Sequence, residues 1–378
     1  MKKPVAIYLT GPLPPPAGGI SVHLQRLRDH LIAHGKEVTV YEDSALIHRS
    51  LRLSLKRLFG RSPRLITRQE SMSGDKNGNV RYLNSIASLL SVIVSDKARQ
   101  KRIIVHYHTK NWKYRALICL ACALNADARS VFTIHSLRDE YRELPVMQRL
   151  CLKYALSRAS FLIAVNERIA DKLESWGGDR NKIAVIPAFL PPQDGNIGSL
   201  PAYVERFMGE REPVLSANAS GLRIIAGKEI YGVRRTIELC ARLKENFPRV
   251  GVVFCLSKID DREYYEKMQG LIREYALEDN FLFVTEPCDF FPVLKKSDVF
   301  LRPTTTDGDA LSVRESLYLG VPAVVSDAVE RPSGSMVFDT DSQESLFLKT
   351  LECLENANDI PKSGYDYLSK ILTVYESI

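Results

Sequence analysis

Cysteine is scarce in this chain of 378 residues: there are seven, an odd number, and most lie inside apolar segments. No disulfide framework is therefore expected. Cys119 and Cys122 form a Cys-x-x-Cys pair, but the surrounding apolar pattern has no second pair of ligands. A buried helix is thus favoured there over a metal or redox site.

Long apolar runs are also missing. No stretch of 18 uninterrupted apolar residues occurs, so no membrane-spanning helix is predicted. The apolar segment near the start ends at Gly11 and is too short for a signal peptide. We therefore expect a cytoplasmic protein, which leaves attachment to a membrane surface open.

The usual nucleotide-binding signatures are absent as well. The chain contains neither Gly-x-Gly-x-x-Gly nor Gly-x-x-x-x-Gly-Lys-[Ser/Thr], so a dinucleotide fold and an ATPase loop are unsupported. The composition, with 45% hydrophobic and 26% charged residues, is that of an ordinary globular protein. A length of 378 residues favours two domains, each large enough to bury its own core.

The charge is divided unevenly along the chain. Residues 1–190 hold 31 Lys and Arg against 15 Asp and Glu, net +16, whereas residues 191–378 hold 21 against 30, net −9. This asymmetry suggests that the first half faces something anionic: nucleic acid, a membrane surface or a phosphorylated substrate.

Short β-rich runs alternate with helical stretches along both halves, which predicts an α/β protein with parallel sheets. A Pro- and Gly-rich segment at 186–201 marks a linker close to the change in charge. We predict two doubly wound, Rossmann-like domains, 1–187 and 188–364, facing a central cleft at the carboxyl ends of both sheets. The expected strands are 5–9, 38–41, 103–106, 130–134, 161–165, 183–186, 213–216, 250–256, 281–284, 298–302 and 321–326.

Two segments could carry chemistry at strand ends. Gly18 and Gly19 follow the first strand and precede a helix, an arrangement that lets backbone N–H groups approach an anion; a flexible turn is the plain alternative. Between Arg302 and Asp327, a polar loop leads into a helix that opens near Ala310 and stops at Gly320. Asp307 just before that helix and Glu315 within it could face one ligand at its N-terminus.

The segment from Asp307 to Glu315 resembles the E-x7-E segment of the family 4 retaining glycosyltransferases. Further elements align in the same order along nearly the whole chain: the Gly18-Gly19 loop, Phe-Thr-Ile-His-Ser around His135, Val-Ile-Pro before the linker, and Gly-Val-Pro after the helix. The resemblance implies a two-domain GT-B fold in which the N-terminal domain binds the acceptor and the C-terminal domain binds a nucleotide-sugar. It also implies that helix 365–378 packs back on the N-terminal domain.

The resemblance assigns roles to matching positions. Glu315 would bind the donor ribose, Asp307 the hydroxyls of the transferred sugar, and His135 the sugar or its phosphate, while Gly18 and Gly19 would approach the diphosphate. The predicted catalytic set is His135, Asp307 and Glu315, which the resemblance implies, together with Lys228 as a substitute cation. The donor-binding set is Gly18, Gly19, Arg223, Lys228, Asp307, Gly308, Asp309, Ala310, Leu311 and Glu315. No cofactor beyond the donor is implied; a UDP-sugar is favoured and a GDP-sugar is possible.

The sequence departs from the family pattern at two points. The first acid is Asp rather than Glu, which shortens its reach by one methylene group. Tyr231-Gly232 stands where the family often has Lys-Gly, a cation for the leaving diphosphate. Lys228 and Arg223 lie nearby, and we expect Lys228 to supply that cation, with a surface lysine as the alternative.

Other residues leave alternatives open. Asp307-Gly-Asp309 spells Asp-x-Asp, which can hold a divalent metal, but the family context favours sugar and loop contacts, so no metal is expected. His106 and His108 project to the same side of a strand end, where they could orient an acceptor or simply be satisfied structural histidines. Backbone atoms near Pro287 and Asp289 could hold the donor base.

A basic stretch without acids runs from Ser44 to Gln69. Its arginines and lysines between Arg49 and Arg68 would form one stripe on a helix, which favours docking on an anionic membrane surface over nucleic acid; a solvated charged face is the alternative. The expected function is sugar transfer, with retention, to a saccharide or lipid-linked acceptor in bacterial capsule, O-antigen or exopolysaccharide synthesis. The alternative is a non-catalytic GT-B module that binds nucleotide or membrane.

Overall fold

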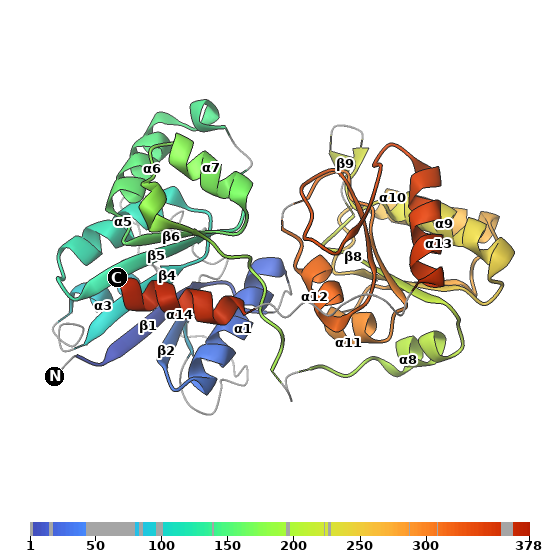
Figure 1. The fold of residues 1–378 in the computed structure, drawn as a ribbon, viewed down its shortest axis with the longest axis horizontal. Helices are drawn as coiled ribbons and strands as arrows, with labels where there is room; N and C mark the ends of the chain where they lie inside the picture. Colours follow the sequence, from blue (N-terminus) through green and yellow to red (C-terminus); the bar gives the residue numbers. More distant parts are fainter. Residues whose placement is uncertain are drawn as a thin grey trace, which may run out of the picture. The chain divides into compact units, whose positions relative to one another are not determined.

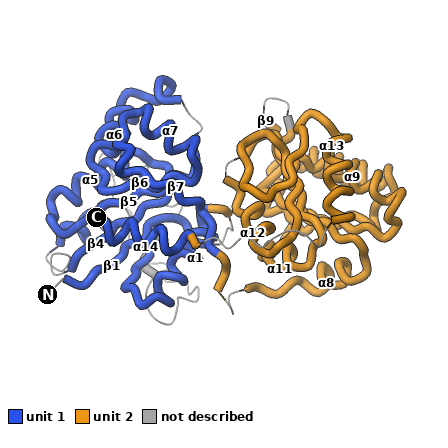
Figure 2. The backbone as a smooth tube through the Cα atoms, viewed as in Figure 1, with its two compact units in different colours: residues 1–15, 20–190, 367–378 blue, residues 16–19, 191–366 orange. Residues whose placement is uncertain are grey.

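The computed structural model describes twelve stretches of the chain: residues 3–14, 18–42, 80–82, 86–95, 101–137, 140–193, 197–222, 224–225, 228–286, 288–307, 309–356 and 366–378. The chain divides into two compact units (Figure 2). Unit 1 comprises residues 1–15, 20–190 and 367–378, and unit 2 comprises residues 16–19 and 191–366. The division after Leu190 lies three residues beyond the predicted boundary, and the last helix belongs to unit 1.

Unit 1 is built on a parallel sheet of seven strands in the order β3-β2-β1-β4-β5-β6-β7 (Figure 1). The strands are β1 (Val5–Gly11), β2 (Glu37–Glu42), β3 (Val80–Tyr82), β4 (Arg102–Tyr107), β5 (Ala128–Ile134), β6 (Phe161–Ala164) and β7 (Ile183–Val185). The helices are α1 (Gly19–Ala33), α3 (Ile86–Val94), α5 (Trp112–Ala123), α6 (Val146–Arg158), α7 (Glu167–Ser175) and α14 (Tyr367–Ser377), with short 3-10 turns η1 (Tyr141–Glu143) and η2 (Arg180–Lys182).

The central strands of unit 1 are buried along almost their whole length. After Arg102, every residue of β4 is buried, as expected for a parallel strand covered by helices on both faces. Helices α5 and α6 pack against each other, and their buried Ile118 and Leu152 join the strands in one core. Cys119 is buried in this core and Cys122 is half-buried; burial raises the pKa of their thiols to about 11 and about 12. The predicted helix is present, but it is buried on one face only and exposed on the other. Both cysteines stay protonated at neutral pH because their thiol pKa values are raised.

Unit 2 repeats the plan with a parallel sheet of six strands in the order β12-β11-β8-β13-β14-β15. The strands are β8 (Val214–Ala219), β11 (Gly251–Leu256), β12 (Phe281–Val284), β13 (Val299–Arg302), β14 (Ala323–Ser326) and β15 (Met336–Phe338); β9 (Ile224–Ile225) and β10 (Lys228–Glu229) form a separate antiparallel pair. The helices are α8 (Ala202–Gly209), α9 (Val233–Asn246), α10 (Arg262–Glu274), α11 (Phe290–Lys295), α12 (Leu311–Leu319) and α13 (Gln343–Glu355).

Local sequence signals explain where several of these helices begin and end. Asp261, Asp289 and Ser342 each accept a backbone N–H from the first turn of the helix that follows, and so cap α10, α11 and α13. Gly320 ends α12 in the left-handed region with a φ of 75°, a conformation that side chains with a Cβ rarely adopt.

The predicted α/β fold is confirmed, and all eleven predicted strands are present, with their ends shifted by no more than three residues. Strands β3, β9, β10 and β15, each two or three residues long, were not predicted. In both sheets the strand order reverses direction once: between β1 and β4 in unit 1, and between β8 and β13 in unit 2. Open α/β sheets bind ligands at the carboxyl ends of the strands at such switch points. Among the described residues, no helix combines the length and the hydropathy needed to cross a bilayer.

Candidate functional site

Each switch point carries a cluster of buried polar side chains. At the end of β8 and β13, Asn218, Arg302, Asp307 and Arg331 are joined by hydrogen bonds and ion pairs; we call these four the arginine–aspartate cluster. At the end of β1 and β4, four imidazoles lie together, and we call them the histidine cluster. Its members are His23, His106, His108 and His135.

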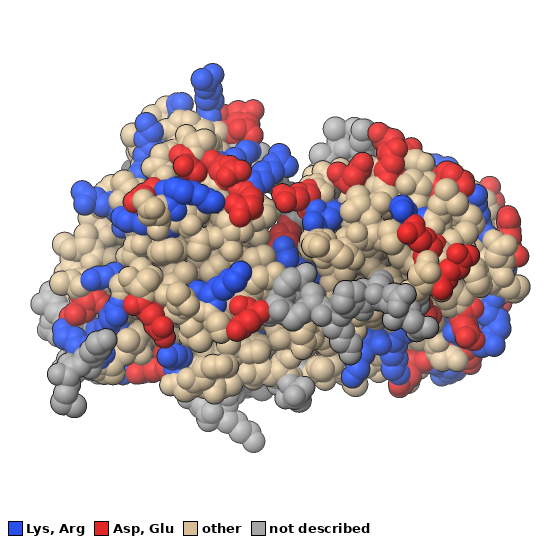
Figure 3. Space-filling view, viewed as in Figure 1, with Lys and Arg blue, Asp and Glu red and all other residues tan. Residues whose placement is uncertain are grey.

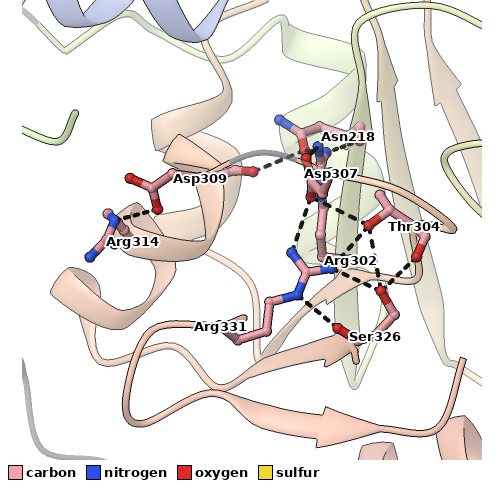
Figure 4. Close-up of polar contacts among 9 residues, drawn as sticks. Asn218, Arg302, Thr304, Asp307, Asp309, Arg314, Ser326 and Arg331 are labelled. Atoms are coloured by element: carbon pink, nitrogen blue, oxygen red, sulfur yellow. Dashed lines mark hydrogen bonds and ion pairs between the residues drawn. The ribbon is translucent and has the colours of Figure 1, made fainter. Parts of the chain in front are cut away.

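Asp307 is held by two arginines (Figure 4). Arg302 donates Nε to Oδ2 at 2.8 Å and Nη2 to Oδ1 at 3.0 Å, a bidentate pair, and Arg331 donates Nη1 to Oδ2 at 3.1 Å. All three side chains are at most 10% exposed. Burial by itself would raise the pKa of the Asp307 carboxyl, but the two guanidinium groups lower that pKa to about 2. Asp307 therefore stays ionised in the folded protein.

The arginines also join the loop after β13 to two neighbouring strands. Arg302 donates Nη1 to both the backbone and the side-chain oxygen of Asn218 on β8, at 2.9 and 3.0 Å. Arg331 donates to the hydroxyls of Thr304 and Ser326 and to the Ser326 carbonyl oxygen. The loop that leads into α12 is thus fixed on both sides of β13, as Figure 4 shows.

Asp309 precedes the first residue of α12, and Glu315 lies within that helix. Asp309 accepts from Arg314 Nε at 2.7 Å, and this pair is also almost fully buried. Glu315 is 4% exposed, one turn into the helix. Ala310 occupies the N-cap position without a side-chain cap, while Ser312 donates to the Asn218 side chain at 3.2 Å. The predicted helix start at Ala310 and end at Gly320 are both confirmed.

The carboxylates of the Asp-x-Asp sequence are therefore paired with arginines rather than gathered around a shared centre. Among the residues that the structure describes, no group of three or more His, Cys, Asp or Glu side chains could hold a metal ion. Sequence reasoning named Asp307 and Asp309 but missed Arg314 and Arg331, whose positions 5 and 24 residues along the chain give no local signal.

The segment before α9 contains Tyr231, one of the two positions that depart from the family pattern, and Gly232, which agrees with it. Gly232 has a φ of 70°, and a Cβ there would lie 2.3 Å from the carbonyl oxygen of Pro303, so only glycine fits. The Tyr231 hydroxyl lies 2.5 Å from Ser220 Oγ, and the Arg302 guanidinium lies 5.3 Å from the centre of its ring. Tyr231 thus packs on the arginine–aspartate cluster at the position where the family often has a lysine.

Several predicted donor-binding residues are only partly covered by the structure. The backbone of Lys228 lies in β10, paired with Ile225, and its side chain is outside the description. Arg223, Gly308 and Pro287 fall outside the described residues, as does the basic stretch Arg49–Arg68. Gly19 is the first residue of α1, where a Cβ would meet no atom within 4 Å, and Gly18 directly precedes it on the surface.

The histidine cluster draws its members from three elements. His23 lies on α1, His106 and His108 at the end of β4, and His135 directly after β5. His108 Nδ1 lies 3.3 Å from His135 Nε2, and the rings of His106 and His108 are 4.1 Å apart. Gly11 at the end of β1 permits this arrangement, because a Cβ there would lie 3.3 Å from the Cβ of His108.

These imidazoles are neutral. Burial lowers the pKa of His23 to about 4 and that of His106 to about 3, and the neighbouring positive groups act in the same direction. Burial followed by the neighbouring histidines also holds the pKa values of His108 and His135 well below their usual range. His106 is fixed by two hydroxyls, with its Nδ1 at 2.6 Å from Tyr375 Oη and its Nε2 at 2.7 Å from Thr133 Oγ1. The contact with Tyr375 comes from α14, so the last helix completes the cluster.

Two family models match the chain. The model for Glycosyltransferase Family 4 matches residues 17–193, and the model for Glycosyl transferases group 1 matches residues 222–335. The first match spans the histidine cluster except for its contact with α14, and the second spans the arginine–aspartate cluster except for Asn218. None of the curated proteins matches the chain in sequence.

Solved structures share the fold at low sequence identity. A complex of Anabaena Alr3699/HepE with UDP and glucose superposes with a TM-score of 0.61 at 15% identity, covering 99% of this chain and 100% of that one. A glycosyltransferase from Rickettsia africae gives 0.63 at 14%, covering 100% and 94%. A sucrose-phosphate synthase from Thermosynechococcus elongatus gives 0.59 at 14%, covering 100% and 96%. Together with the two family matches, this shared fold shows that the chain is a family 4-like glycosyltransferase of the GT-B type.

Proposed function

We propose that this glycosyltransferase moves a hexosyl group from a nucleoside diphosphate sugar, with UDP favoured over GDP, to a saccharide or lipid-linked saccharide. We propose that the anomeric configuration is retained and that the reaction serves the synthesis of a bacterial surface polysaccharide. Unit 2 would hold the donor and unit 1 the acceptor. The complex of the similar Anabaena protein with UDP and glucose supports the choice of donor.

The observation that carries the proposal is the loop between β13 and α12. It ends at the switch point of unit 2 and presents the uncapped start of α12, where backbone N–H groups and the helix dipole favour a diphosphate. Glu315, one turn further on, is proposed to accept the hydroxyls of the donor ribose through charge-assisted hydrogen bonds. One short segment would then bind both the diphosphate and the ribose of the donor.

Asp307 acts in this proposal as a positioning residue, because its carboxylate is bound by Arg302 and Arg331. These pairs fix the loop and thereby the start of α12. A direct contact between Asp307 and the transferred sugar stays a prediction. Lys228 is proposed to neutralise the leaving diphosphate together with the helix N-terminus, and His135 to contact the sugar or its phosphate. The departing phosphate would then help to deprotonate the acceptor on the same face, which accounts for retention.

Glu315→Gln tests the donor site. The amide keeps the size of the side chain but cannot act as a charged acceptor, so we expect kcat/KM for sugar transfer to fall at least about 100-fold. Glu278→Gln, an exposed position in the same unit, is the matched control and should retain full activity. The assay screens UDP- and GDP-sugars against saccharide and lipid-linked acceptors, and NMR of the product gives its anomeric configuration.

Three outcomes would count against parts of this proposal. Unchanged transfer by Glu315→Gln, with the fold intact, contradicts the site assignment. An inverted anomeric centre contradicts retention. Thermal stabilisation by UDP or GDP without transfer or hydrolysis of any donor would instead support a non-catalytic nucleotide-binding module.

We also propose that the protein attaches to the inner face of the cell membrane through the Arg49–Arg68 stretch, which lies outside the described residues. Each basic side chain near an anionic lipid surface contributes on the order of 1 kcal/mol. Flotation with phosphatidylserine-containing vesicles should therefore fall sharply when Arg52, Arg57 and Arg61 are changed to Glu. Neutral phosphatidylcholine vesicles are the control, and undiminished binding of the triple variant to anionic vesicles rejects the idea.

A further inference from the structure

A cavity of about 450 Å³ opens within unit 1 beside the histidine cluster. It lies at the carboxyl ends of β4 and β5, between the loops that follow these strands, the first turn of α5 and the end of α7. The polar and charged side chains that line it are Lys110, Asn111, Lys113, Arg115, Ser136 and Gln148. Its described lining contains three cations and no carboxylate, although unit 1 as a whole supplies many acids.

Arg115 is the least usual of these side chains because it is 2% exposed and forms no ion pair with any residue that the structure describes. Its Nη2 donates to the Thr109 carbonyl oxygen at 2.7 Å, but its buried Nε has no hydrogen-bond partner among the described residues. The guanidinium group also faces aromatic rings, and its central carbon lies 4.2 Å from the centre of the Trp112 ring. A buried cation without a carboxylate costs free energy, and a bound anion would offset that cost.

The cavity adds two exposed cations and a helix end to this buried charge. Lys110 and Lys113 are exposed at its rim, on either side of the start of α5. Asn111 caps that helix by accepting the N–H groups of Lys113 and Tyr114 at 3.0 and 3.4 Å, and the helix dipole adds partial positive charge at the same point. Three full charges and one partial charge therefore converge on a small volume.

The aromatic residues point to what accompanies the anion. The chain has only two tryptophans, Trp112 and Trp176, and both line this cavity. Large aromatic faces beside hydroxyl and amide groups, here Ser136 and Gln148, suit a ring with an apolar face and a hydroxylated rim. A sugar ring has this character, whereas a free inorganic anion would make no use of the indoles.

We propose that this cavity is the acceptor subsite and that the acceptor is a sugar bearing a covalently attached anion, a phosphate or a carboxylate. The inference rests on the proposed sugar transfer and specifies the acceptor class. The anion binds Arg115, Lys110 and Lys113, and the ring lies against the tryptophans. His135 immediately precedes the lining residue Ser136, and Arg115 and Lys110 contribute to the lowered pKa of its imidazole, so an acceptor bound here lies close to the histidine cluster.

Titration of the full chain with small probes, followed by tryptophan fluorescence, tests the subsite directly. Because both tryptophans line the cavity, the signal reports this site and not unit 2. The probes are glucose 1-phosphate, glucuronate, methyl glucoside, inorganic phosphate and a farnesyl diphosphate-linked glucose. We expect the three anionic sugars to bind at least 10-fold more tightly than methyl glucoside and than phosphate alone. The farnesyl-linked probe distinguishes a lipid-linked source from a soluble sugar phosphate.

Two variants at exposed positions keep the test independent of folding. Lys110→Glu with Lys113→Glu should weaken the anionic sugars at least 10-fold, while Lys36→Glu, an exposed position at the amino end of β2, should leave them unchanged. Equal affinity for methyl glucoside, equal affinity for free phosphate, or equal loss in the Lys36 variant would each overturn the proposal. Glu315→Ala should bind these probes normally, so failure here and failure of the donor site are separable.

Discussion

The two units place buried titratable groups at equivalent points of similar sheets but handle their charge in opposite ways. At the β1/β4 switch point of unit 1, four imidazoles lie together in their neutral form. At the β8/β13 switch point of unit 2, Asp307 keeps its charge because Arg302 and Arg331 surround it. The same fold therefore supports a neutral polar cluster in one unit and an ion-paired cluster in the other.

Because of this contrast, the two units should lose stability at different pH values. A buried histidine that stays neutral lowers the free energy of unfolding once the same histidine takes up a proton in the unfolded chain, which begins near pH 6.5. An ion-paired aspartate contributes fully to the free energy of unfolding above the ordinary carboxyl pKa, near 3.8. That contribution is lost only as the pH falls below this value. Acid or a single substitution should therefore weaken one of the two clusters and leave the other intact.

Acid should unfold unit 1 before unit 2. The pKa values of His23 and His106 are lowered, so their contribution to stability is complete above pH 6.5 and falls as the pH drops toward about 4 and about 3. At pH 5 each histidine then reduces the free energy of unfolding by about 2 kcal/mol. The Asp307 contribution, with a pKa lowered to about 2, is present above pH 3.8 and lost only as the pH falls through 2.

Tryptophan fluorescence follows unit 1 alone, since both tryptophans lie there, and hydrogen exchange of β8, β11 and β13 follows unit 2. The expected result is a fluorescence transition in the range from pH 6 to pH 4 while the strands of unit 2 stay protected. Simultaneous loss of both signals, or earlier loss of protection in unit 2, contradicts the contrast.

Removing the charge of Asp307 should affect unit 2 selectively. Asp307→Asn leaves Arg302 and Arg331 buried without their carboxylate, and breaking such a pair costs about 3 kcal/mol. We expect urea unfolding to show earlier exposure of β13 and β14 by hydrogen exchange, with the tryptophan transition unchanged. Asp279→Asn, at an exposed position of the same unit, is the control. If the two variants unfold alike, the cluster does not fix the loop before α12.

Much of this fold could be predicted from the sequence because its strands are buried and apolar. Runs such as Val250–Leu256 and Phe281–Val284 stand out against the helices between them, and Gly320 marks the end of α12 plainly. The positions of Asp307 and Glu315 around the start of α12 also follow from local spacing. The sequence alone did not show which side chains contact these residues.

The partners were missed because tertiary contacts bring them from distant positions. Arg331 reaches Asp307 from a loop after β14, and Tyr375 reaches His106 across 269 residues. The sequence indicated only that His106 and His108 lie together. The fold brings His23 from α1 and His135, directly after β5, next to them. Arg115 lies within the first turn of an ordinary helix, and only its burial without a carboxylate makes it notable. Local patterns report periodicity and turns, and they carry no information on which side chain completes a buried polar cluster.

The smallest predicted effect tests whether the last helix supports the histidine cluster. Tyr375→Phe removes the hydroxyl 2.6 Å from His106 Nδ1 and leaves that ring nitrogen buried without this partner, at a cost of about 1 kcal/mol to unit 1. Tryptophan fluorescence in urea at pH 8 should show the shift, and Tyr275→Phe, at an exposed position in unit 2, should not. At pH 5 the shift should be no larger, because losing a hydrogen bond to the neutral imidazole raises its pKa in the folded protein and so reduces the stability lost on acidification. A larger shift at pH 5 than at pH 8 would contradict this role of the hydroxyl, and no shift at either pH would separate α14 from the neutral cluster that distinguishes unit 1 from unit 2.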